Sequence, residues 1–110
     1  MAKYVIRKAT NGQFWWVLKS GNGETILTSE TYTTKQSCLD GVASSKLNIS
    51  DGNFNRLTSI RNEPYFTQIA GNYQTLGTSE MYSSIYARDA GIKSVQLNAR
   101  LAIIEDLTQN

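Results

Sequence analysis

Hydrophobic and polar residues alternate along the first part of the chain, in short runs that turn sequences separate. Residues 4–9 and 14–19 are rich in β-forming side chains, and Asn11-Gly12 between them is a strong hairpin signal. A second turn, Gly21–Gly23, leads to a third run at 25–29. We therefore predict three consecutive antiparallel strands.

The pattern changes to a helical period after these strands. Thr33 or Thr34 can cap the first turn of a helix. Apolar and small residues then recur at spacings of three and four, at Cys38, Val42, Ser45 and Ile49.

The second part of the chain predicts the same elements in the same order. Strands are expected at 54–60, 65–70, 74–79 and 101–107, and a helix at 84–99. A gapless shift of 50 residues aligns the two parts, and 11 of the 36 positions from 14 to 49 are identical to their partners. Unrelated sequence would give roughly two to four matches.

This self-similarity predicts a single domain, residues 1–110, made of two repeats at 1–52 and 53–110. One half alone buries too little apolar surface to be stable. We therefore expect the two halves to share one core, in a monomer with an internal pseudo-twofold axis.

Composition limits the classes of partner. The net charge is +2, which is too small to argue for nucleic acid or an anionic membrane as a partner. No apolar run exceeds the five residues 14–18, so we expect no transmembrane helix and no signal peptide. The single cysteine, Cys38, fits a reducing cytoplasm.

The chain contains no histidine, which excludes Ser-His-Asp and Cys-His catalysis and zinc sites with histidine ligands. The sparse carboxylates form no set with metal-ligand spacing, and Cys38 has no neighbouring cation to activate it. We expect no catalytic residue, no metal and no cofactor. An enzyme would need an unusual site built from the repeated motif described next.

A Ser-Glu-x-Tyr motif occurs in both halves and is the first candidate binding site. Its members are Ser29, Glu30 and Tyr32, and Ser79, Glu80 and Tyr82. One reading is a polar pocket at a strand-to-helix corner. The other, which we favour, is that Ser and Glu satisfy backbone donors at the helix entrance while the Tyr ring packs.

Trp15 and Tyr65 occupy equivalent positions and form the second candidate. They point away from their neighbours Trp16 and Phe66, so an uncovered sheet face would expose them near Arg7, Lys19 or Arg61. Such a face can stack single-stranded bases. The other reading, which we favour because the net charge is close to zero, is that both rings pack across the sheet.

The motifs also resemble those of the YegP-like family of bacterial proteins, which carry short tandem copies of a domain of unknown function. The residues that carry the resemblance are Gln13-Phe14, 16–24, 29–35, 91–95 and Asn98-Ala99. The resemblance implies a β-β-β-α-β unit used twice, with both copies in a single sheet, their terminal strands exchanged, and helices on one face. We expect about eight strands in this sheet. The resemblance implies no substrate.

Four features of the halves bear on packing. Gly41 and Gly91 lie inside the predicted helices, where we attribute them to close helix–sheet packing. Pro64 is expected at a strand start or edge. Gln68 stands where the first half has Leu18, so we expect that strand to shift register or to be partly exposed.

The sequence therefore predicts an α+β fold in which two tandem β-β-β-α-β repeats form one mostly antiparallel sheet with two helices on one face. For function, it favours a small non-catalytic binding or protein-interaction module whose ligand and partner it does not identify. Single-stranded nucleic-acid binding on an aromatic sheet face is the alternative, and an enzyme is the least favoured reading.

Overall fold

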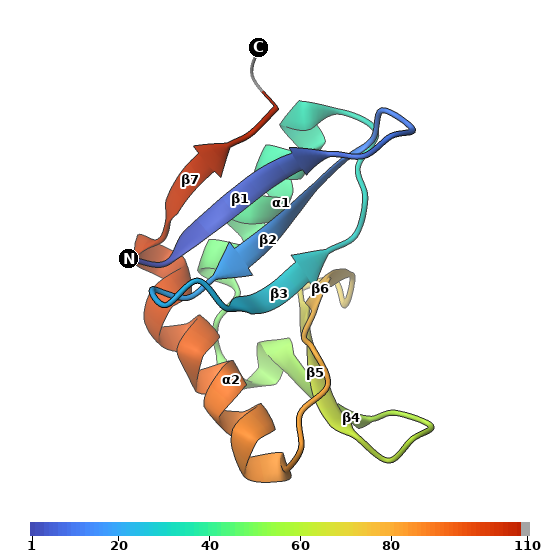
Figure 1. Ribbon diagram of the computed structural model, residues 1–110, viewed down its shortest axis with the longest axis vertical. Helices are drawn as coiled ribbons and strands as arrows, with labels where there is room; N and C mark the ends of the chain where they lie inside the picture. Colours follow the sequence, from blue (N-terminus) through green and yellow to red (C-terminus); the bar gives the residue numbers. More distant parts are fainter. Residues whose placement is uncertain (109–110) are drawn as a thin grey trace.

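The computed structural model describes residues 1–108 and consists of one seven-stranded sheet and two helices (Figure 1). The strands are β1 (Lys3–Lys8), β2 (Phe14–Lys19), β3 (Thr25–Ser29), β4 (Phe54–Thr58), β5 (Pro64–Ile69), β6 (Thr75–Thr78) and β7 (Ile103–Asp106), and the helices are α1 (Lys35–Leu47) and α2 (Ile85–Asn98).

The local sequence signals lie where these elements begin and turn. Thr34 caps α1 by accepting a hydrogen bond from the backbone N–H of Ser37 at 3.0 Å, and Ser84 caps α2 in the same way from Ala87 at 3.0 Å. Gly12 has a φ of +84° in the β1–β2 turn, a conformation that glycine adopts without strain. The predicted strand and helix positions are therefore confirmed, with ends that differ by a few residues.

The sheet has the order β4-β5-β6-β3-β2-β1-β7, so the first three strands of each half lie together (Figure 1). The two groups meet at β3 and β6, which pair in antiparallel fashion at only two positions, Thr28 with Thr78 and Ser29 with Gly77. A continuous sheet thus joins the two halves, and its middle junction is short.

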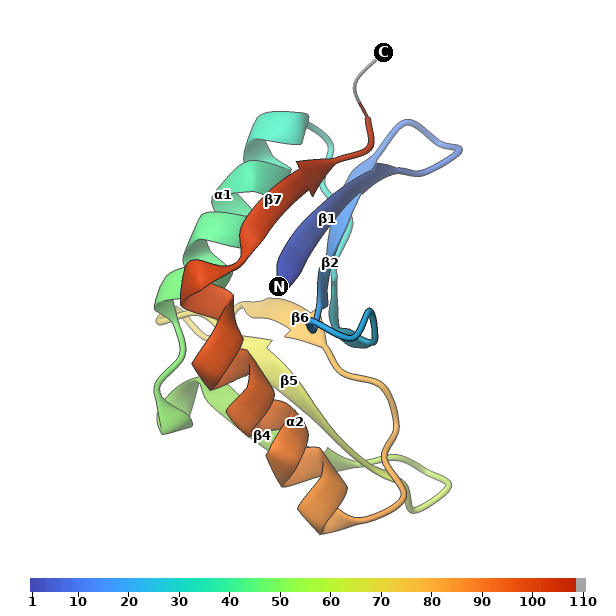
Figure 2. The ribbon, with the colours of Figure 1, turned by 60° about the vertical axis from the view of Figure 1, so that its left-hand side comes forward.

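Both helices cover the same face of this sheet (Figure 2). Alternate residues of β1 and β2 point to the helices and are buried, as the two-residue period requires. One cluster joins side chains from both halves and both helices, among them Tyr4, Trp16, Val42, Phe66 and Ile92. The opposite side of the sheet, which carries no helix, is called the helix-free face below.

The strand that follows α2 returns to the first half. β7 pairs with β1 in parallel, from Lys3 beside Ile103 to Ile6 beside Asp106. Lys35, at the start of α1, forms an ion pair with Asp106, and this contact, with hydrogen bonds from Thr108, lowers the pKa of that carboxyl to about 2. The sheet is therefore mixed rather than wholly antiparallel.

The expectation of about eight strands with mutually exchanged ends is wrong, because only one terminal strand crosses between halves. After α1 the chain enters β4 through residues 48–53, and β4 already occupies the place that β1 has in the first half. No residues remain for a strand outside β4. In the described part of the chain, β4 is consequently an uncovered edge of the sheet.

Polar residues adapt this edge to solvent. Arg56 stands at the position equivalent to the fully buried Ile6, and Asp89 at that of the partly buried Leu39. The Arg56 Nε and the Asp89 Oδ1 are 3.2 Å apart and half exposed. Charged side chains of this kind discourage strand addition at a sheet edge.

Gln68 is not exposed, contrary to one part of the sequence expectation. The other part, a change of register, applies only to the pairing of β5 with β6, where the register shifts between Gln68 and Ile69 as it does between Leu18 and Lys19 in the first half. The Gln68 side chain is fully buried and keeps the register of β5 with β4, opposite Phe54. Its Nε2 donates to the backbone oxygens of Ser45 and Asn48 at 2.9 and 2.8 Å, and its Oε1 accepts from the Ser45 hydroxyl at 2.6 Å. A buried amide is tolerated here because both of its ends are satisfied.

Candidate functional site

The serines of the repeated motif are bound to the backbone. The Ser29 hydroxyl accepts from the Trp16 N–H at 2.8 Å and donates to the Glu30 carbonyl at 2.7 Å. Ser79 makes the equivalent bonds with Phe66 and Glu80, at 2.9 and 2.8 Å. The serines thus satisfy strand donors of β2 and β5 rather than donors at the helix entrance.

The tyrosines of the motif lie against the helix glycines. A Cβ placed on Gly41 would overlap the Tyr32 hydroxyl and lie 2.7 Å from Cζ of the same ring, and Gly91 has the same relation to Tyr82, at 2.8 Å. The Tyr82 ring also stacks on Phe66, with ring centroids 6.2 Å apart. The glycines therefore permit close packing, as expected, but their nearest neighbour is the motif tyrosine.

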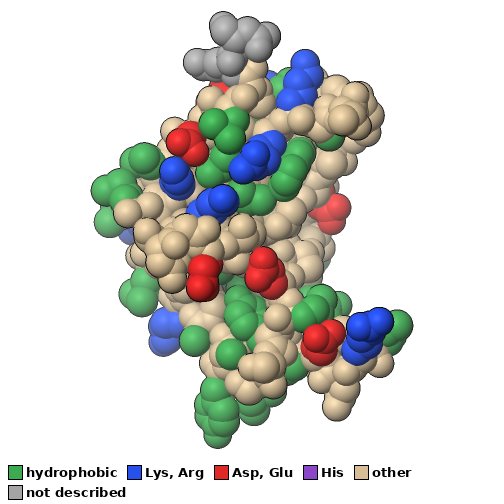
Figure 3. All heavy atoms as spheres, viewed as in Figure 1, with side chains coloured by type: hydrophobic (Ala, Val, Ile, Leu, Met, Phe, Trp, Pro, Cys, Tyr) green, Lys and Arg blue, Asp and Glu red, His purple; other side chains and the backbone are tan. Residues whose placement is uncertain are grey.

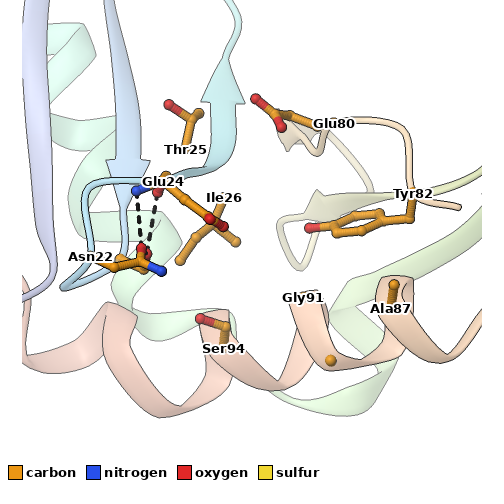
Figure 4. Close-up of a pocket in the computed structure, with 11 residues that line it drawn as sticks. Asn22, Glu24, Thr25, Ile26, Glu80, Tyr82, Ala87, Gly91 and Ser94 are labelled. Atoms are coloured by element: carbon orange, nitrogen blue, oxygen red, sulfur yellow. Dashed lines mark hydrogen bonds between the residues drawn. The ribbon is translucent and has the colours of Figure 1, made fainter.

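Each tyrosine borders a pocket that is built from both halves. The first pocket, of about 320 Å³, lies between the β2–β3 turn and α2 (Figure 4). Asn22, Glu24 and Ile26 line it from the first half, and Glu80 and Tyr82 from the second. In Figure 4 the Glu24 side chain extends from its turn toward the Tyr82 ring, whose hydroxyl points back toward that turn.

A second pocket, of about 350 Å³, repeats this arrangement with the halves reversed. It lies between the β5–β6 turn and α1, with Asn72 and Gln74 on one side and Glu30 and Tyr32 on the other. Six of the 11 pairs of identical residues line the two pockets. These pairs are Asn22 and Asn72, Thr25 and Thr75, Glu30 and Glu80, Tyr32 and Tyr82, Gly41 and Gly91, and Ser44 and Ser94.

Structural roles explain some of these identities. The Asn22 side chain accepts from the Glu24 N–H at 3.1 Å and so shapes its turn, and Asn72 does the same for Gln74 at 3.1 Å. By contrast, the exposed carboxylates of Glu30 and Glu80 make no hydrogen bond or ion pair within residues 1–108. Packing alone does not explain why both halves keep them.

Each pocket holds two carboxylates and no Lys or Arg among its lining residues. The first has Glu24 and Glu80; the second has Glu30 and Asp40. In the second pocket, Gln74 stands at the position of Glu24, so one carboxylate is lost. Asp40, at the position of Ala90, adds one, so each pocket has two acidic groups. Both pockets are therefore electronegative.

Burial and these acids hold the tyrosines in their protonated form. Burial raises the pKa of Tyr82, and the charges of Glu80 and Glu24 raise it further. Burial likewise raises the pKa of Tyr32, while the adjacent Trp16 indole N–H opposes part of the rise. That indole N–H is buried and meets no acceptor at hydrogen-bond geometry within residues 1–108.

Cys38 is fully buried on α1. Burial, with a smaller contribution from the charge of Asp106, raises the pKa of its thiol to about 11. The thiol is therefore protonated near neutral pH, which makes it a poor nucleophile.

Trp15 and Tyr65 both lie on the helix-free face, opposite their buried neighbours Trp16 and Phe66, and both are half-buried. Strands β3 and β6 lie between β2 and β5, and the two rings line no common hollow among those described. Figure 3 shows Lys and Arg side chains gathered over β1 and β2, with hydrophobic side chains between them. Arg61 lies away from Trp15, in the turn between β4 and β5.

Neither α1 nor α2 is long and apolar enough to cross a membrane. Within residues 1–108, no three His, Cys, Asp or Glu side chains come together in a way that could hold a metal ion.

Sequence reasoning missed half of each pocket. It found the Glu and Tyr of the motif, but it gave no binding role to Asn22, Glu24, Asn72 and Gln74. The identity of Asn22 and Asn72 under the 50-residue shift was the available signal. The sequence did not show how the two halves are placed in the sheet. That placement brings the β2–β3 turn to α2 and the β5–β6 turn to α1.

Two segments of the chain, residues 9–53 and 61–106, match the sequence profile described as "Domain of unknown function (DUF1508)". The chain belongs to this family. A UPF0339 protein of Acinetobacter baylyi is 47% identical over 106 residues, which cover 96% of each chain, and the YegP protein of Escherichia coli K12 is 40% identical over 106 residues. The resemblance to YegP-like proteins is thereby confirmed.

Solved structures of the family have the same fold. The solution NMR structure of a UPF0339 protein from Shewanella oneidensis matches with a TM-score of 0.91 and 45% identity, covering 96% of this chain and 91% of that one. The solution NMR structure of Escherichia coli YegP, a "protein of unknown function", matches with a TM-score of 0.92 and 38% identity, covering 99% and 96%. The names of these relatives state no activity.

Proposed function

We propose that this chain is a small non-catalytic binding module in which each of the two pockets takes a protonated amine group. One observation carries the proposal: both halves keep an exposed glutamate whose carboxylate makes no hydrogen bond or ion pair within residues 1–108, in a pocket that a tyrosine also lines.

The charge of the lining residues supports an amine as the ligand group. Two carboxylates face each pocket without a neighbouring Lys or Arg in the lining. An ammonium group donates three hydrogen bonds, and carboxylate and phenol oxygens accept them. The raised pKa values of Tyr32, Tyr82 and Cys38 favour binding over catalysis, because none of these groups is activated as a base or nucleophile near neutral pH.

We also infer that residues 1–52 and 53–110 are two copies of one unit, joined in a monomer with an internal pseudo-twofold axis. The last two residues of the second copy lie outside the described part of the chain. Three observations support this arrangement: the identical residues at a shift of 50 positions, the two family matches and the two equivalent pockets. The single buried Cys38 supports a reducing, cytoplasmic location.

A titration with putrescine, a diamine, tests the binding proposal. We expect ¹H–¹⁵N NMR shifts at low ionic strength for Asn22 and Gly91 in the first pocket and for Asn72 and Gly41 in the second. The neutral analogue butanediol should cause none, because the carboxylates attract only the charged probe.

Substitutions assign the response to each pocket. Glu80→Gln should abolish the shifts in the first pocket alone, and Glu30→Gln those in the second alone. Glu63→Gln removes the same charge from an exposed turn and should change neither. Absence of shifts in both pockets, or an effect of Glu63→Gln equal to that of Glu80→Gln, would refute the proposal.

A further inference from the structure

The helix-free face over β1 and β2 combines cations with an aromatic ring. Lys3, Arg7 and Lys19 lie on this face with Trp15, at positions that alternate with the core residues of the same strands. Val5 and Val17 lie between them, yet they are only 1% and 5% exposed although no helix covers them. The long neighbouring side chains therefore cover the valines with their apolar stems and keep their charged ends in solvent.

The arrangement of these cations opposes stability in the free protein. Lys3 and Lys19 lie directly opposite each other on neighbouring strands. Like charges in that position are destabilising. Glu105 offsets part of this, at 3.3 Å from Lys3. Arg7 and Lys19 have no carboxylate within 4.0 Å among residues 1–108, so two charges on the face are not neutralised.

The second half shows that the fold does not need these charges. At the positions equivalent to Arg7 and Lys19 it has Leu57 and Ile69, in strands with the same pairing. The aromatic position is kept, since Tyr65 stands where Trp15 does. The cations are thus a property of the first half alone, and the sheet folds equally without them.

Trp15 separates two hollows on this face. One, of about 490 Å³, is lined by Arg7, Trp15, Val17, Lys19, Thr25, Thr28 and Glu80, and the other, of about 440 Å³, by Arg7, Lys8, Ala9, Thr10, Trp15 and Leu107. Arg7 and Trp15 border both, and they are paired across β1 and β2. A planar group can therefore approach the indole beside a guanidinium from either side.

We propose that the first-half part of the helix-free face binds single-stranded nucleic acid, with a base stacked on Trp15 and phosphates held by Arg7 and Lys19. Unpaired bases stack on aromatic side chains of exposed sheets, while cations bind the backbone. The hollow that contains Lys8 and Thr10 has no acidic lining residue, whereas Glu80 borders the other. The strand therefore runs from the Lys8 side across Trp15 to Lys19, in the hollow that Glu80 borders.

Binding of fluorescently labelled oligo(dT) and oligo(U), followed by anisotropy, tests this interface. The affinity should fall steeply as salt rises, because phosphate contacts release counterions. Arg7→Gln and Lys19→Gln should each weaken binding and flatten the salt dependence. Arg61→Gln is the matched control, since it removes one exposed charge from the β4–β5 turn and should leave the affinity unchanged.

Intrinsic fluorescence tests stacking separately. Trp15 is half-buried whereas Trp16 is fully buried, so the oligonucleotide should quench the emission of Trp15 and not that of Trp16. Trp15→Leu should abolish the quenching and raise the Kd about tenfold, the effect of losing one stacked base. Trp15→Tyr, which installs the aromatic residue of the second half, should retain most of the affinity.

Three outcomes would overturn the proposal. The first is no anisotropy change for the unaltered chain at low salt. The second is an equal loss for Arg7→Gln and Arg61→Gln, which would indicate attraction to the net charge. The third is displacement of the oligonucleotide by poly-glutamate together with full affinity in Trp15→Leu, which would identify an acidic polypeptide as the partner.

Discussion

Replacing Gln68 with leucine is expected to lower the free energy of unfolding by about 2–4 kcal/mol, although leucine is the residue at the equivalent position of the first half. The change removes the donor for two backbone oxygens, those of Ser45 and Asn48, and the acceptor for the Ser45 hydroxyl. A buried polar group left without a partner loses its hydration without compensation. Chemical denaturation measures the effect.

The cost arises because three side chains form one network. Ser45 also shares a hydrogen bond of 2.8 Å with the buried Tyr4 hydroxyl, whose pKa burial raises to about 12. The positions equivalent to Tyr4, Ser45 and Gln68 hold Phe54, Val95 and Leu18, an apolar set that also takes residues from both halves. All three polar residues of the network are thus apolar at the equivalent positions.

A combined variant is therefore the control. Tyr4→Phe with Ser45→Val and Gln68→Leu copies the apolar set, and we expect it to be less destabilised than Gln68→Leu alone, since replacing all partners avoids unpaired groups. A triple variant whose loss equals the sum of the three single losses would show that the network is not coupled.

Replacing Gly41 with alanine is expected to destabilise the protein by about 2–3 kcal/mol. In an exposed helix the same change stabilises by about 1 kcal/mol, because alanine is the better helix former. Here the added methyl group would overlap the Tyr32 hydroxyl and lie 3.1 Å from the Trp16 Nε1. The ring, the helix or both must move to accommodate it, and thermal or chemical denaturation reports the loss.

The background Tyr32→Ala isolates this contact. Without the phenol ring, Gly41→Ala should become neutral or stabilising, as in an ordinary helix. The sign of the effect then depends on the partner side chain, which a double-mutant cycle measures directly. The same destabilisation in both backgrounds would mean that the contact with Tyr32 does not require the glycine.

Short-range signals in the sequence predicted most of the fold. Thr34 and Ser84 cap their helices, and the Asn11-Gly12 turn joins β1 to β2, because each depends only on a few neighbouring residues. Trp16 and Leu18 face the core for the equally local reason that strand side chains alternate.

The errors concern contacts between residues distant in sequence. Gln68 is buried because Ser45 and Asn48, some 20 residues earlier, satisfy its amide. The alternation of polar and apolar residues along one strand does not reveal hydrogen-bond partners from another element. Similarly, the pairing of Glu24 with Tyr82 at one pocket follows from the order of the strands in the sheet, which is set by the β3–β6 junction.

The central claim is that the two halves form one cooperative unit across the two-residue junction of β3 and β6. Native-state hydrogen exchange of the full chain tests it most directly. Amides of Ile6 and Leu18 in the first half, and of Phe66 and Ile92 in the second, should exchange with one opening free energy, equal to that of global unfolding. Separate values, with one half opening at much lower cost and smaller denaturant dependence, would contradict the claim.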